Sequence, residues 1–156
     1  MPNAMMKARD SIYGSLAECY ITIGTRRYNF MSLTDFESKW EVKITEVKIL
    51  GKVGMGHKAA GGEGTWSGTA HYNQSHFRAI AEHYQKTGEM PYFEIQVSNE
   101  DPTSAAGRQT IIHRDCLCDK FTLAKFKAGE EILDEELSGT FESWDMPEKF
   151  NELEGY

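Results

Sequence analysis

Long apolar runs, basic charge and cysteine are all scarce in this chain of 156 residues, and each scarcity excludes a class of protein. No segment approaches the roughly 20 apolar residues that cross a bilayer, and the N-terminus lacks the apolar stretch of a signal peptide. Basic residues number 17 against 24 acidic ones, and a net charge of −7 disfavours a surface that neutralises nucleic-acid phosphates. We therefore expect a single domain, residues 1–156, that begins in the cytoplasm and does not insert into a membrane.

The few cysteines exclude a disulfide framework. An odd number of thiols without an export signal is typical of reduced, buried side chains, here Cys19, Cys116 and Cys118. Zinc ligation by His113 with the two later cysteines is the alternative, but His113 would face away from them unless the chain bends at Arg114 and Asp115. No nucleophile, base and acid arrangement is visible, and the remaining histidines lack a nearby acidic partner. We predict no catalytic residue, no metal site and no cofactor.

Short stretches of alternating apolar and polar residues are abundant and predict strands. They lie at 17–23, 28–30, 40–49, 65–72, 93–97, 110–112, 117–123 and 137–141. One segment has helical spacing instead, about 75–87, with Phe77, Ile80 and Tyr84 on one face and Gly88 at its end. This pattern predicts a mainly β (α+β) fold, an antiparallel β-sandwich or barrel of about seven or more strands with one flanking helix.

Three segments depart from these patterns. Residues 1–16 show little periodicity and are predicted to form a mobile N-terminal arm. The alternation of 40–44 resumes at Val47 and Ile49 with opposite parity, which predicts a β-bulge near Thr45 and Glu46. The acidic run at 130–136 is interpreted as a solvated connection.

The glycine-rich segment 51–64 is predicted to be a hairpin loop without secondary structure of its own. A phosphate-binding loop is disfavoured, because His57 occupies the lysine position, Lys58 the hydroxyl position, and a strand follows where a helix is needed. Ordering a segment with many glycines costs much conformational entropy in a monomer. We therefore expect the loop to become ordered against a neighbouring copy. The candidate contacts are Lys52, Val53, Met55, His57, Lys58 and Glu63, with Lys7 and Ile12 from the N-terminal segment 1–16. A mobile surface loop and a small ligand-binding β-barrel remain alternatives.

Several of these segments, taken in order, resemble one known family. The hallmark region of PBSX-type phage tail tube (core) proteins is similar to the run 46–51, to Gly56 with His57 and Lys58, and to Gly61, Gly64 with Thr65, and Gly68 with Thr69. Those proteins build the tubes of contractile phage tails and phage tail-like bacteriocins. The similarity continues at residues 7–14, 91–93, 123–124 and 135–149, and so covers nearly the whole chain.

The resemblance implies a non-enzymatic structural subunit with a β-sandwich or barrel fold. Family members form hexameric rings, stacked as a hollow tube inside a contractile sheath that delivers DNA or punctures a membrane. The implied partners are other copies of the chain, the tail sheath, tape measure and baseplate proteins, and DNA passing through the lumen. The implied location is the bacterial cytoplasm during assembly and then the tail of a virion or phage-like particle. A tube protein of a type VI secretion apparatus is the alternative within this class.

Overall fold

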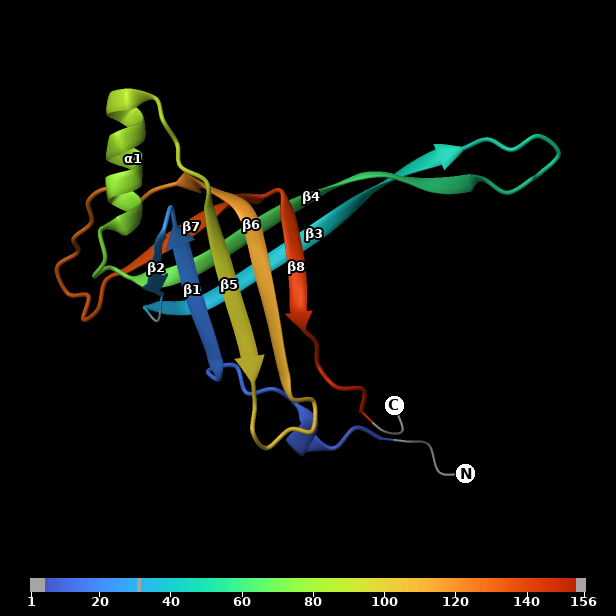
Figure 1. Cartoon of the computed structure of the whole chain (residues 1–156), viewed down its shortest axis with the longest axis horizontal. Coiled ribbons are helices and arrows are strands. Elements are labelled where there is room, and N and C mark those ends of the chain that lie inside the picture. The colour runs from blue at the N-terminus through green and yellow to red at the C-terminus, as the bar shows by residue number, and fades with distance from the viewer. Residues whose placement is uncertain (1–4, 31, 154–156) are drawn as a thin grey trace.

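A computed structural model describes residues 5–30 and 32–153 and shows a β-sandwich with one helix (Figure 1). The described residues form eight strands: β1 (Ala17–Ile23), β2 (Arg26–Asn29), β3 (Leu33–Val47), β4 (Gly56–His71), β5 (Phe93–Glu100), β6 (Arg108–Lys120), β7 (Asp134–Phe141) and β8 (Ser143–Glu148). A short 3-10 helix, η1 (Ala8–Asp10), precedes them, and α1 (His76–Thr87) lies between β4 and β5. The predicted fold class is confirmed.

All strand pairs are antiparallel, and β6 belongs to both layers of the sandwich. Its first half lies between β5 and β8 in the sheet β2-β1-β5-β6-β8, and its second half pairs with β7 in the sheet β6-β7-β4-β3. The register against β5 shifts by one residue where Asp115 adopts a φ of 54°. This bulge bends β6 from one sheet into the other. The strands predicted separately at 110–112 and 117–123 therefore belong to one bent strand.

The core fills the space between the two sheets. It is built from alternate residues of the strands, because side chains of a strand point to opposite faces. The buried apolar residues include Ile21, Trp66, Phe93, Ile95, Leu137 and Phe141. Helix α1 adds Phe77 and Ile80, and Gly88 ends the helix in the left-handed conformation. The helix prediction is confirmed.

The hairpin of β3 and β4 is the most extended part of the molecule, and it corrects the prediction for the glycine-rich segment. The segment 51–64 is not a loop throughout, because β4 begins at Gly56. Gly56 pairs with Val47, the last residue of β3, and the pairing continues from there into the body of the protein. The predicted bulge near Thr45 and Glu46 is also wrong. The register shift lies between Val42 and Ile44, where β4 accommodates the extra residue near Gly61, whose φ is 118°.

Two further predictions near the C-terminus are corrected. The acidic run is not wholly a solvated connection, because its second half forms the start of β7, where Glu135 is buried. Residues 121–123 lie outside any strand, whereas β8, which carries Trp144 and Pro147, was not predicted. The proline in β8 obscured the strand pattern, because proline cannot donate a hydrogen bond to a neighbouring strand.

The N-terminal segment contacts the turn between β5 and β6. The Asp10 carboxylate accepts a hydrogen bond from the Ala105 amide at 3.1 Å, and the Ser104 hydroxyl donates to the Asp10 carbonyl at 3.0 Å. The Tyr13 amide donates to Asp101 at 3.0 Å. The mobility of residues 1–16 and the single-domain assignment stay predictions, and residues 1–4 of the predicted arm lie outside the described residues. No helix in the described part of the chain is long and apolar enough to cross a bilayer.

Candidate assembly interface

The outer part of the β3–β4 hairpin projects away from the sandwich, and we call residues 41–63 the arm (Figure 1). Strand β7 pairs with β4 only from Gly64 to His71, so among the strands that the structure describes, the two strands of the arm pair with each other alone. Every residue of the arm except Gly56 is exposed. An isolated two-stranded hairpin is marginally stable in water, which favours an arm that is stabilised by contacts with another protein.

Apolar side chains lie on both faces of the arm. Val42 and Ile44 follow Trp40 on one face of β3, and Ile44 is 58% exposed. Val47 lies on the opposite face, because no register shift separates it from Ile44. The turn adds Leu50 and Val53, both fully exposed. The shift of the apolar residues from even to odd positions in the sequence therefore reflects an arm with exposed apolar side chains on both faces. Several exposed apolar side chains on one projection favour a protein contact.

Glycines at the base of the arm make room for aromatic rings. A Cβ at Gly62 would lie 2.5 Å from the Trp40 ring, and one at Gly64 would lie 2.5 Å from the Phe141 ring. The two rings pack with centroids 6.1 Å apart. Part of the glycine content is therefore explained by ring packing at the point where the arm leaves the core, rather than by flexibility.

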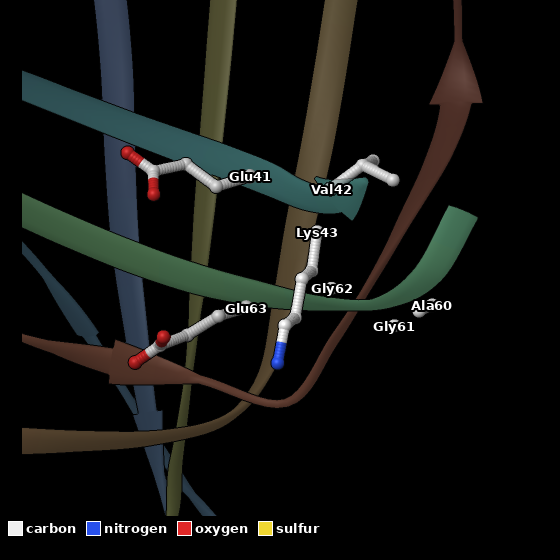
Figure 2. A pocket seen from close by; sticks show the side chains of 7 residues that line it. All are labelled: Glu41, Val42, Lys43, Ala60, Gly61, Gly62 and Glu63. Carbon is white, nitrogen blue, oxygen red and sulfur yellow. The ribbon is translucent and has the colours of Figure 1, made fainter. Parts of the chain in front are cut away.

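One face of the arm also carries a polar depression with a volume of about 480 Å³. Figure 2 shows the side chains of Glu41, Lys43 and Glu63 on one side of the hairpin, whereas Val42 extends away from them. Glu41 and Glu63 are directly opposite in the strand register, and like charges in that position repel. Since the arm projects from the sandwich, we interpret this depression as a contact site for a neighbouring protein rather than a binding site for a small molecule.

The structure brings six of the eight predicted contact residues together on the arm. Lys52, Val53 and Met55 lie in the turn, His57 and Lys58 begin β4, and Glu63 lies near the base; all six are exposed. Lys7 is exposed beside η1 and Ile12 is half-buried, and neither belongs to the arm. Their roles in assembly stay predictions.

Sequence reasoning missed the apolar residues of the arm and a second exposed group. Val42, Ile44, Val47 and Ile49 were interpreted as core-strand alternation, although their change of parity was the available signal. The second group consists of Leu123, Phe126 and Ile132 in the connection between β6 and β7, where Phe126 is 92% exposed. An apolar residue in an irregular connection gives no periodic signal.

His113 and the three cysteines lie in the core of the sandwich. The bulge at Asp115 places His113, Cys116 and Cys118 on the same buried face, but both ring nitrogens of His113 are occupied. Nδ1 donates to the Ile95 carbonyl at 2.9 Å, so Nε2 accepts from the Ser38 hydroxyl at 2.8 Å in the neutral ring. Burial lowers the pKa of His113, and the hydrogen bond to Ile95 partly opposes this shift. The ring therefore links the two sheets.

The thiols are free and buried, which confirms the prediction of reduced cysteines. Burial raises the pKa of Cys19 and Cys116 to about 12 and that of Cys118 to about 11. The protonated thiol is a poor nucleophile and a poor metal ligand. Within residues 5–30 and 32–153, no group of three histidine, cysteine or acidic side chains could hold a metal ion.

One prediction about the histidines is wrong. His71 and His83 do have acidic partners: the Nδ1 of His71 lies 3.0 Å from the carboxylate of Asp134, and the Nε2 of His83 lies 3.4 Å from that of Glu89. The His71 and Asp134 side chains are 43% and 47% exposed, so water screens the pair. The partner of His71 was missed because Asp134 is far away in the sequence and meets His71 only through the pairing of β4 with β7.

Known proteins are similar to this chain over nearly all of its length. The sequence profile of a family described as phage tail tube protein matches residues 4–148. The phage-like element PBSX protein XkdM of Bacillus subtilis (strain 168) is 30% identical over 147 residues, which cover 94% of this chain and 97% of XkdM. The uncharacterised protein YqbM of the same strain is 31% identical over 144 residues, covering 92% and 95%.

Solved structures share the fold at low sequence identity. A chain in the cap that terminates the tube of the anti-feeding prophage superposes with a TM-score of 0.67 at 10% identity, covering 92% of this chain and 95% of that one. A chain in the extended sheath–tube complex of the extracellular contractile injection system PVC gives 0.62 at 11% identity, covering 82% and 86%. The solved structures show only that the fold is shared, whereas the profile match and the identity with XkdM are similarities of sequence over nearly the whole chain. The chain belongs to the phage tail tube protein family.

Proposed function

We propose that this protein is a non-catalytic subunit of a phage or phage-like tail tube, which self-assembles into hexameric rings stacked inside a contractile sheath. The observation that carries the proposal is the arm, a two-stranded projection with apolar side chains on both faces, which no third strand supports among the described residues. Such an arm suits a contact with two neighbours, one in the same ring and one in the next ring along the tube.

The free edge of β3 supports ring formation. Strand β3 spans Leu33–Val47, and the only partner that the described residues give it is β4. The other outer strands are short, and they carry features that discourage pairing: Arg26 and Arg27 in β2, and Pro147 in β8. A long unpaired edge presents free N–H and C=O groups to a second sheet. Head-to-tail pairing at this edge can close into a ring if the rotation between copies fits.

The location and partners follow from this assembly. The subunits would associate in the bacterial cytoplasm and then reside in the tail of a virion or phage-like particle. The tube would contact the sheath on its outside and the tape measure and baseplate proteins at its ends. DNA would pass through the lumen in an infectious phage, and in a headless particle the tube would puncture a membrane.

Sedimentation velocity across a wide range of protein concentrations tests the proposal. We expect discrete ring-sized species and larger filaments to replace the monomer as concentration rises. A chain that stays monomeric at every concentration and salt condition would contradict the proposal. Tight binding of a small molecule by that monomer would favour the ligand-binding alternative.

A further inference from the structure

Two groups of exposed apolar residues lie at opposite ends of the long axis of the molecule. The arm forms one end, and the connection between β6 and β7, drawn in orange, lies at the other, below α1 (Figure 1). We call residues 43–58 the arm tip and residues 121–136 the receptor segment. Contacts between different surfaces at opposite ends of identical copies can repeat without limit, which is the geometry of an open polymer.

The arm tip is basic in a protein that is otherwise acidic. It contains four lysines and one glutamate, a net charge of +3, with histidine neutral. Since the whole chain has a net charge of −7, the remaining residues carry −10. In the described part of the chain, none of these four lysines forms an ion pair or donates a side-chain hydrogen bond. The arm tip is therefore complementary in charge to the body of a second copy.

The receptor segment offers both apolar and acidic groups. Leu123, Phe126 and Ile132 are 66% or more exposed. The segment has five carboxylates and two lysines, and when Glu135, which pairs with Arg78, is left out its net charge is −2. Glu131 and Glu136 are exposed without an ion-pair partner among the described residues.

Hydrogen bonds hold the receptor segment against its own subunit. The Tyr72 hydroxyl donates to the Leu123 carbonyl at 3.2 Å, and Arg78 donates to the Thr122 carbonyl at 3.3 Å. The Lys125 ammonium donates to the Asp134 carbonyl at 2.8 Å. The Tyr72 and Arg78 side chains thus anchor the start of the segment, the Lys125 bond lies within it, and the Tyr72 amide anchors its end by donating to the Leu133 carbonyl at 2.9 Å. A preorganised surface loses less conformational entropy on binding, as a docking site requires.

We propose that the arm tip of one copy docks on the receptor segment of a second copy. Apolar residues of the turn, such as Leu50 and Val53, cover Phe126 and Ile132, while Lys48, Lys52 and Lys58 face Glu130, Glu131 and Glu136. This contact rests on the proposed function, because it is one of the contacts that join copies in the tube. The lysines and glutamates of this contact make assembly weaker at high salt, since ions screen exposed charges.

Reciprocal charge reversal tests the contact. The arm variant carries Lys48→Glu, Lys52→Glu and Lys58→Glu, and the receptor variant carries Glu130→Lys, Glu131→Lys and Glu136→Lys. Each variant alone should need at least about tenfold more protein to assemble than wild type, because like charges now meet at the contact. An equimolar mixture should assemble at close to the wild-type concentration, because each arm then finds a complementary receptor on the other variant. Lys149→Glu, outside both segments, is the control and should assemble normally.

Light scattering against concentration, with circular dichroism to confirm folding, gives the readout. The proposed contact is overturned if each variant assembles normally alone, or if the mixture assembles no better than its components. In either case, assembly of the wild-type protein would still support the tube function. Wild-type protein that never assembles overturns the tube function and this contact together. Rescue in the mixture supports the contact specifically, because a folding defect in either variant would not be corrected by the other.

Discussion

At the scale of single residues, His113 shows how a polar side chain can be part of a β-sandwich core. Its ring lies between the rings of Phe36 and Phe141, with centroid distances of 5.6 and 4.9 Å. It also bridges Ile95 and Ser38 from the two sheets. In the neutral form with the proton on Nδ1, both nitrogens are satisfied, because the Ser38 hydroxyl can donate to an unprotonated Nε2. Burial is what favours this neutral form over the charged one.

This arrangement predicts a pH dependence of stability. The folded-state pKa of His113 is lowered by burial, so between that pKa and the unfolded value of about 6.5 the unfolded state binds more protons. The contribution of His113 is therefore complete above about pH 6.5 and is lost as pH falls below it. Urea unfolding at pH 7.5 and 5.5 should show the stability gap between wild type and His113→Gln narrowing by up to about 1 kcal/mol at the lower pH. A gap that is constant or widens would contradict this account.

At the scale of secondary-structure elements, a nearly buried ion pair joins α1 to β7. The Arg78 guanidinium lies 2.6 Å from the Glu135 carboxylate, and the side chains are only 19% and 5% exposed. Arg78 also donates to the Gln74 and Thr122 carbonyls, and it lies over the Tyr72 ring at 4.4 Å. The pair therefore positions the helix, the receptor segment and the start of β7 together.

Removing one partner of this pair should be more costly than removing both. Arg78→Met leaves the buried Glu135 carboxylate without its cation, and we expect a loss of about 3–5 kcal/mol in the free energy of unfolding. Adding Glu135→Leu should recover part of that loss, because no unpaired charge then remains buried. Urea unfolding of the four proteins in a double-mutant cycle measures the coupling. Additive losses would show that the two side chains do not interact as described.

The success of sequence reasoning at this scale depended on the kind of signal. The strand at 17–23 and the helix near 75–87 were predictable, because burial on one face imposes a period of two or 3.6 residues. The bend of β6 was not, since its cause is a non-glycine residue, Asp115, in the left-handed region. The arm was recognised as important, but its glycines were interpreted as a loop. The aromatic rings that require Gly62 and Gly64 come from Trp40 and Phe141, which are distant in sequence.

At the scale of the whole molecule, the candidate site is a set of surfaces rather than a pocket. The six predicted contact residues of the glycine-rich segment were found together because they are close to one another in the chain. The receptor segment and the free edge of β3 depend on the order of strands in the sheets, which alternation alone does not specify. As a member of the phage tail tube family, the chain combines a closed core with edges and projections suited to joining copies of itself.

We infer that the arm joins copies into a tube, whereas the sandwich folds without it. A matched variant is available because Glu41 and Glu63 pair directly across the hairpin. Replacing residues 42–62 by Asn-Gly should leave the core intact, since the removed residues lie beyond the support of β7 and Asn-Gly forms a tight two-residue turn.

Electron microscopy of the purified wild-type protein beside this arm-shortened variant, both at high concentration, tests the claim most directly. We predict hollow tubes of stacked rings for wild type, and for the variant folded particles that do not elongate into tubes. Compact single particles from wild type under every condition, or tubes of equal length from both proteins, would contradict it.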